Sequence, residues 1–221
     1  MPVSAIEKTI RQLNPLPREF YNPDPRKVGP ELLGKILVRR DGRQLLAARI
    51  VELEAYLGKD DPAAHSFRGR TARNAIMFGP PGFAYVYFIY GNHYCLNVTC
   101  QPEGIAHALL FRAVEPLVGL EAMARARGIT LDGPRSLRNL TSGPGRMAEA
   151  FGVTRVRDNG DDFTTPKSGL TIVDDGYRVK KVVVTKRIGI TKAADLPLRY
   201  LIGGNAFVSG TARLNSGNET T

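Results

Sequence analysis

The sequence predicts an α+β fold with a mostly antiparallel β-sheet, and three observations support this. Most apolar segments are runs of strand length, and two pairs of them are joined by short turn sequences typical of β-hairpins. Helical patterns gather near the N-terminus and in the middle of the chain instead of alternating with every strand. The 221 residues contain no internal repeat and no low-complexity linker, so we expect one domain over residues 1–221.

Local signals place the elements within this fold. Asp24 and Pro25 are typical of a helix N-cap followed by a first helical position, and Asp41-Gly42 is typical of a hairpin turn. A loop over residues 58–82 is long enough to suggest a functional segment. In chain order we expect a helix over Ser4–Leu13, a connector to about residue 24, a helix to about Leu33, a hairpin over 36–57, the loop, a hairpin over 84–100 with its turn at 91–93, a strand over 107–116, helices over 117–127 and 143–151, strands over 169–174, 181–190 and 199–204, and a frayed polar tail over about 213–221.

Composition limits the partners. Thirty-one Lys and Arg against 21 Asp and Glu give a net charge of +10, which favours a polyanionic partner such as a nucleic acid. No apolar run could span a membrane, and the N-terminus has no apolar signal core, so we expect a soluble, intracellular protein with no membrane partner. Cys95 and Cys100 are expected to be reduced thiols that do not pair with each other.

Common cofactor motifs are missing from the sequence. It has no P-loop, no dinucleotide-binding fingerprint, no CxxC pair and no HExxH. His93 and Cys95 share one strand face and could begin a metal site. A structural zinc needs four ligands, however, and few other ligands are available, so we expect no metal.

Carboxylates alternate with apolar residues in the strand that ends at "VELEAYL". Glu52, Glu54 and Tyr56 point to one face, opposite Val51 and Leu53. The two glutamates could form the acid and base of a carbohydrate glycosidase. On spacing alone, two solvated carboxylates on an exposed face are the favoured interpretation.

Arg112 interrupts the apolar run "HALLFRAVEP", where a buried guanidinium needs an acceptor. Glu54 is a candidate partner. Spacing does not separate a structural ion pair from a functional one.

Tyrosines and arginines suggest contacts with a nucleic acid. Tyr85, Tyr87, Tyr90 and Tyr94 crowd one hairpin, and core packing is the default for strand tyrosines. Tyr90, beside the turn, has little core to reach, so it could stack on bases or act as a wedge between them. The long loop also carries Arg68, Arg70 and Arg73, which could contact phosphates or simply be solvated.

Six blocks occur in order between about Leu33 and Phe207: "VELEAYLG", "DPAAHS", "MFGPPGFAYVYFIYGNHYCLNV", "LLFRAVEP", "SGPGRMAEAFG" and "RIGI". Together they strongly resemble the alkyladenine or 3-methyladenine DNA glycosylase family, in its bacterial type. The resemblance covers most of the chain. It implies a curved antiparallel sheet flanked by helices, with a protruding β-hairpin.

The resemblance also implies an activity. The protein would be a monomeric base-excision repair enzyme without cofactor that flips 3-methyladenine, 7-methylguanine, hypoxanthine or ethenoadenine out of duplex DNA and hydrolyses the N-glycosidic bond. It would be monofunctional, without lyase activity, because no lysine stands at the matched pocket positions. Which of these lesions is preferred does not follow from the sequence.

By the same resemblance, individual residues receive roles. Glu54 would be the general base that deprotonates the attacking water, and Arg112 would lie beside it and keep it ionised. Tyr90 would fill the gap left by the flipped base. The expected base-binding residues are Tyr56, His65, Tyr87 and Asn97, and the backbone of Ile188 and Gly189 would lie near the abasic-site phosphate and the water.

Two details need a structure. With a plain two-residue turn at Gly91-Asn92, Asn97 would pair opposite Val86 and lie across the sheet from Tyr87. We therefore expect a bulge or a longer turn between Tyr90 and His93. The segment "QPEGIAHALLF" leaves the strand offset before Arg112 open, and His107 receives no role.

Overall fold

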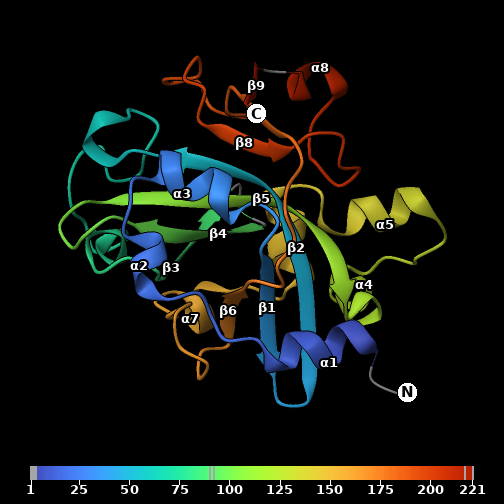
Figure 1. The fold of residues 1–221 in the computed structure, drawn as a ribbon. Coiled ribbons are helices and arrows are strands. Elements are labelled where there is room, and N and C mark those ends of the chain that lie inside the picture. Colours follow the sequence, from blue (N-terminus) through green and yellow to red (C-terminus); the bar gives the residue numbers. More distant parts are fainter. Residues whose placement is uncertain (1–3, 90, 92, 217, 221) are drawn as a thin grey trace.

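A single antiparallel sheet forms the centre of the molecule in a computed structural model, which describes residues 4–89, 91, 93–216 and 218–220. Every pairing between the described strands is antiparallel. Along the sheet the strands follow the order β3-β4-β5-β2-β8-β7-β9, and β1 pairs with both β2 and β6. The predicted α+β class is confirmed. In order, the strands are β1 Ile36–Asp41, β2 Gln44–Tyr56, β3 Ala84–Ile89, β4 His93–Cys100, β5 His107–Val118, β6 Leu170–Val173, β7 Val182–Thr185, β8 Arg199–Ile202 and β9 Asn218–Thr220 (Figure 1).

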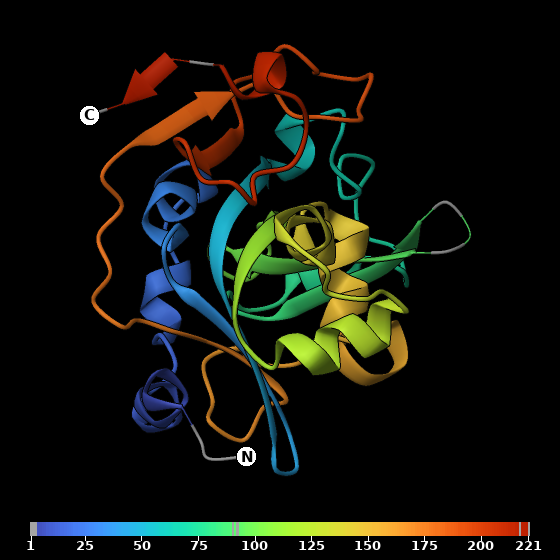
Figure 2. The ribbon, with the colours of Figure 1, turned by 90° about the vertical axis from the view of Figure 1, so that its right-hand side faces the viewer.

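Helices lie on both sides of the curved sheet. The N-terminal helices lie on one side, and α4, α5 and α6 lie on the other (Figure 2). Ser4 and Asp24 cap α1 and α3 with their side chains, as the sequence predicts for Asp24. The helices are α1 Ala5–Gln12, α2 Arg18–Tyr21, α3 Pro25–Leu32, α4 Leu120–Arg127, α5 Pro134–Thr141, α6 Pro144–Ala150, α7 Arg155–Asp158 and α8 Ala212–Asn215, with 3₁₀ turns η1 Gly58–Asp60 and η2 Ala75–Phe78. Among the described residues no helix is long and apolar enough to cross a membrane.

Several boundaries differ from the sequence prediction. Asp41 pairs with Gln44, so the first hairpin turns at Gly42-Arg43, one residue later than expected. Helix α5 was not expected, because "PRSLRNLT" is mostly polar and buries only Leu140 and Thr141. The tail expected to be frayed contains α8 and strand β9, which pairs with β7.

Three register shifts interrupt the pairing of the central strands β2 and β5, and two of them lie beside Arg112. Ile50 pairs with Val114, Glu52 with Ala113 and Leu53 with Phe111, so Val51 on β2 and Arg112 on β5 are the extra residues. A bulge bends its strand and redirects a side chain. The register settles the strand offset before Arg112, whose guanidinium reaches both Glu52 and Glu54.

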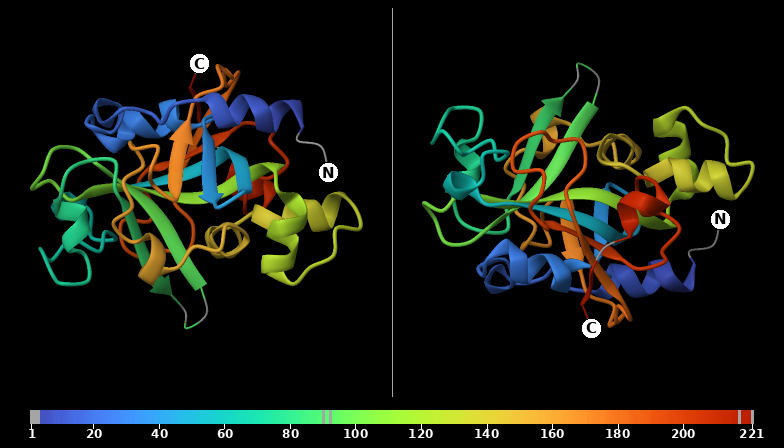
Figure 3. Two further views of the ribbon diagram at one scale, coloured as in Figure 1. Left: turned by 90° about the horizontal axis from the view of Figure 1, so that it is seen from below. Right: turned by 90° about the horizontal axis from the view of Figure 1, so that it is seen from above.

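The hairpin of β3 and β4 projects beyond the rest of the sheet (Figure 3). Its ladder ends at the pair Ile89 and His93, and Tyr85 pairs with Asn97. This register confirms that the connection is longer than a two-residue turn, and it brings Asn97 to the same face as Tyr85. Tyr90 lies outside the described residues.

Candidate active site

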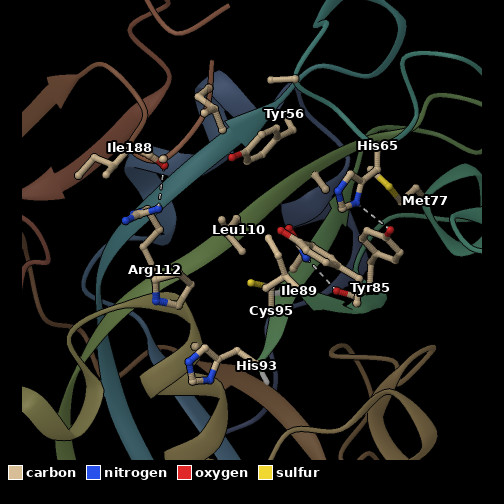
Figure 4. A pocket seen from close by; sticks show the side chains of 18 residues that line it. Tyr56, His65, Met77, Tyr85, Ile89, His93, Cys95, Leu110, Arg112 and Ile188 are labelled. Atoms are coloured by element: carbon tan, nitrogen blue, oxygen red, sulfur yellow. Dashed lines mark hydrogen bonds between the residues drawn. The ribbon is translucent and has the colours of Figure 1, made fainter. Parts of the chain in front are cut away.

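A cavity of about 320 Å³ opens between the sheet, the loop after β2 and the segment after β7. In Figure 4, Arg112 and Ile188 lie at one end, His65 and Tyr85 at the other, and Tyr56 between them. Of the residues proposed from the sequence, the cavity wall contains Tyr56, His65, Tyr87, Asn97, Arg112, Ile188 and Gly189. The remaining wall residues are Ala63, Met77, Tyr85, Ile89, His93, Cys95, Ala108, Leu110, Pro144, Gly145 and Ile190.

Glu54 lies directly behind this wall, fully buried. Its Oε1 accepts a hydrogen bond from the backbone N–H of Ile188 at 2.8 Å and lies 3.2 Å from Nη1 of Arg112. Its Oε2 accepts from the hydroxyl of Tyr56 at 2.9 Å. Three donors from three elements therefore hold both oxygens of one carboxylate in place.

Arg112 binds both glutamates of β2. Its Nε donates to Oε1 of Glu52 at 2.8 Å, while Nη1 faces Glu54. Burial alone would lower the pKa of Arg112, but the charges of Glu54 and Glu52 outweigh it and the pKa is raised. Arg112 is therefore a permanent cation at the cavity wall, and the expected pairing with Glu54 is confirmed.

Glu52 belongs to a buried network behind the site. Its Oε1 accepts from Nε of Arg199 at 2.7 Å, and its Oε2 accepts from the backbone N–H of Ser209 at 2.7 Å. Glu52 and Arg199 are completely buried, so the expected pair of solvated carboxylates is wrong for both Glu52 and Glu54. Glu52 does not line the cavity and has no open oxygen for a sugar, which removes the basis of the paired-carboxylate interpretation.

One wall of the cavity is aromatic. The rings of His65 and Tyr87 meet edge to face with centroids 4.4 Å apart, and Tyr85 and Tyr87 lie 5.5 Å apart. Nδ1 of His65 lies 3.0 Å from the hydroxyl of Tyr85. Burial and the nearby Arg73 lower the pKa of His65, so this ring is neutral at neutral pH. Burial raises the pKa of Tyr87 and, with Glu54, that of Tyr56, so both phenols are protonated.

Asn97 reaches the cavity from β4 and is almost fully buried. Its Nδ2 donates to the backbone carbonyl of Tyr85 at 3.0 Å across the ladder. The side-chain amide therefore supports the sheet and faces the cavity at once.

The segment after β7 completes the wall opposite β2. Gly189 adopts φ +78°, a left-handed conformation that favours glycine. The carbonyl of Ile188 accepts from Nη1 of Arg112 at 3.5 Å. Arg187 places its guanidinium 4.6 Å from the ring centroid of Tyr56 and forms an ion pair with Asp61. Sequence reasoning missed Arg187 and Asp61, although each is the first residue of a block that carries the family resemblance, "RIGI" and "DPAAHS".

Comparisons with known proteins show the family of this chain. The family model described as methylpurine-DNA glycosylase (MPG) matches residues 19–206. The chain belongs to this family. It is 63% identical over 202 residues to a protein of Koribacter versatilis, covering 91% of this chain and 96% of that protein. It is 48% identical over 197 residues to one of Burkholderia cenocepacia (88% and 91%) and 46% identical over 200 residues to one of Methanoculleus marisnigri (88% and 98%). All three are named "Putative 3-methyladenine DNA glycosylase".

Membership of the methylpurine-DNA glycosylase family confirms the predicted resemblance and identifies the chain as a DNA-repair hydrolase. His93 and Cys95 both line the cavity of this glycosylase, but the described part of the chain has no group of three His, Cys, Asp or Glu side chains arranged to hold a metal ion. Cys95 and Cys100 are free and buried. Gly145 allows α6 to approach the cavity, since a Cβ there would lie 2.9 Å from Cγ of His93.

The arginine-rich loop lies next to the aromatic wall of the glycosylase. Arg73 is 6.0 Å from the ring centroid of Tyr87 and donates to the carbonyl of Phe88 at 3.4 Å. Arg68 and Arg70 are exposed. Their contact with phosphates stays a prediction. His107 is buried beside Gly58 and takes no part in the cavity wall.

Proposed function

We propose that this protein is a monofunctional purine DNA glycosylase that removes alkylated or deaminated purines flipped out of duplex DNA, acting as a monomer without cofactor. The observation that best supports this proposal is the geometry of Glu54. Its carboxylate is fully buried behind an aromatic cavity and is held in place by Ile188, Tyr56 and Arg112. The candidate substrates are 3-methyladenine, 7-methylguanine, hypoxanthine and ethenoadenine.

The reaction needs a cavity that holds a base and a carboxylate at its edge. The flipped purine enters between Tyr56 and the pair formed by His65 and Tyr87, where flat rings stack on it. A base carrying a positive charge from alkylation gains cation–π attraction in such a setting. Asn97 faces the purine edge and discriminates against the 2-amino group of guanine.

Hydrolysis then proceeds through water. Glu54 takes a proton from a water molecule, whose oxygen forms a bond to C1′ while the bond from C1′ to the purine nitrogen breaks. The electron pair leaves with the purine, which neutralises the charge of an alkylated base. Arg112 keeps the carboxylate in place through its contacts with Glu54 and Glu52.

A monofunctional reaction is supported by the composition of the cavity wall. Strand cleavage by Schiff-base chemistry needs an amine nucleophile, and no lysine is among the described residues of the wall. The wedge that fills the space left in the duplex is assigned to Tyr90, which lies outside the described residues, from the family resemblance alone.

The test is single-turnover release of free base from duplexes that each carry one lesion. Glu54→Gln should reduce the rate by ~10² or more, the scale of a lost general base, while lesion-duplex affinity stays close to that of the parent; because Glu54 is a buried partner of Arg112, the assay is run well below the lowered Tm of the variant. Base release by the variant near the parent rate removes Glu54 from the mechanism. Duplex binding by the parent without release of any base makes the protein a DNA-binding scaffold instead of an enzyme.

A further inference from the structure

A buried ion pair stands beside Tyr56, the aromatic residue of the cavity wall whose hydroxyl donates to Glu54. Arg187 and Asp61 have side chains with no solvent exposure. Nη2 of Arg187 donates to Oδ1 of Asp61 at 2.8 Å, Nη1 donates to the other carboxylate oxygen, and Nη1 also donates to the carbonyl of Ala55 at 2.9 Å. Asp61 in turn accepts from the backbone N–H groups of Leu57 and Ala63 at 3.2 and 3.1 Å.

The guanidinium covers one face of the Tyr56 ring, with Cζ 4.6 Å from the ring centroid. Tyr56 lines the cavity and Arg187 does not. The covered face is therefore the one turned away from the cavity, and the other face is left for a bound base. A base stacked on that face at ~3.5 Å stands ~8 Å from the guanidinium, with the ring between them.

A cation at that distance affects how strongly the cavity binds a charged base. It repels a positively charged purine and has little effect on the binding of a neutral one. Arg73, near Tyr87, is exposed, so water screens its charge. Arg187 has no solvent around it, and Asp61 is the carboxylate paired with it. Burial opposes ionisation of Asp61, but Arg187 and the two backbone donors lower its pKa below the usual range, so the carboxylate is charged at neutral pH.

We propose that Asp61 and Arg187 determine specificity by charge balance: the carboxylate cancels the cation behind Tyr56, so that the cavity accepts positively charged alkylpurines as well as neutral purines. This inference rests on the proposed glycosylase function. It assigns Asp61 and Arg187 as positioning residues that act through Tyr56 and that do not touch the base.

The two members of the pair predict opposite outcomes. Asp61→Asn keeps the size of the side chain and leaves an uncancelled cation, so excision of 7-methylguanine should fall relative to hypoxanthine by ~10-fold or more. Arg187→Gln leaves an uncancelled carboxylate, so the same ratio should rise by a similar factor. The double variant buries no unpaired charge and should return the ratio to the parent value.

The experiment measures single-turnover excision of both lesions at enzyme concentrations below saturation, at a temperature well below the Tm of each variant. Asp158→Asn is the matched control, because Arg39 and Asp158 form a comparably buried ion pair, 5% and 0% exposed, whose members do not line the cavity. It should lower Tm and leave the ratio unchanged. Should Asp61→Asn not fold, Arg187→Gln and the double variant still test the proposal in the other direction.

The outcomes separate this inference from the proposed function. A parent protein that excises neither lesion defeats the proposed function itself. A parent that excises both, with Asp61→Asn and Arg187→Gln lowering both rates in parallel, shows that the pair only supports the fold and overturns charge balance. Charge balance is established if the ratio of 7-methylguanine to hypoxanthine excision falls in Asp61→Asn, rises in Arg187→Gln and returns to the parent value in the double variant.

Discussion

Removing the charge of Glu52 should destabilise the protein strongly although this side chain touches no substrate. In Glu52→Gln, Arg112 and Arg199 lose their common carboxylate, and the new amide group faces donors that need an acceptor. Breaking a buried ion pair by neutralising one partner costs ~3–5 kcal/mol. For a chain of 221 residues one kcal/mol corresponds to ~2–4 °C in Tm, so Tm should fall by ~6–20 °C.

Thermal unfolding followed by far-UV circular dichroism measures this shift, and a urea titration checks that the unfolding remains cooperative. Asp195→Asn is the control, because its ion pair with Lys186 is exposed, with side chains 91% and 66% accessible. That variant should stay within about 2 °C of the parent. A Glu52→Gln protein that melts within about 3 °C of the parent would refute the network as a source of stability.

Three further predictions concern the cavity. Asn97→Ser should raise excision of guanine-type bases relative to hypoxanthine on a lesion panel, because a smaller group relieves the clash with the 2-amino group; lowered Tm with an unchanged ratio would leave Asn97 a purely structural partner of the sheet. Tyr90→Ala should slow excision from strongly paired duplexes more than from mismatched ones, since the wedge offsets the cost of unstacking; equal losses on both would contradict a wedge. Because the pKa of His65 is lowered from 6.5, this ring gains its proton only when the pH falls below that value. In a pH series from 8 to 5, excision of 7-methylguanine should then decline more than excision of hypoxanthine. This difference between the two lesions should vanish in His65→Gln.

Much of the fold follows from local sequence. Hairpin turns and caps are short-range signals, so the strands around residues 36–56 and 84–100 and the helix begun by Asp24 were predicted within a residue or two. Helix α5 was missed because its apolar face is narrow, and α7 because four residues give no periodicity.

The burial of the glutamates could not be predicted from spacing. Alternation in β2 shows that Glu52, Glu54 and Tyr56 share a face, but it does not show what covers that face. The cover comes from Arg199 and Ser209, far along the chain, and from Arg112 on the neighbouring strand. The family resemblance supplied the role of Glu54, whereas its donors became visible only in three dimensions.

The contact between Ile188 and Glu54 spans 134 residues of sequence, and that between Ser209 and Glu52 spans 157. During synthesis the chain emerges from its N-terminus, so the aromatic residues and Glu54 are made long before their partners. A nascent chain that ends before Arg187 has neither the backbone donor to Glu54 nor the cation behind Tyr56. Long-range contacts of this kind also form late in folding. A copy that ends before Ile188 therefore lacks the assembled carboxylate, and the proposed base release is expected only from chains that include the segment up to Ser209.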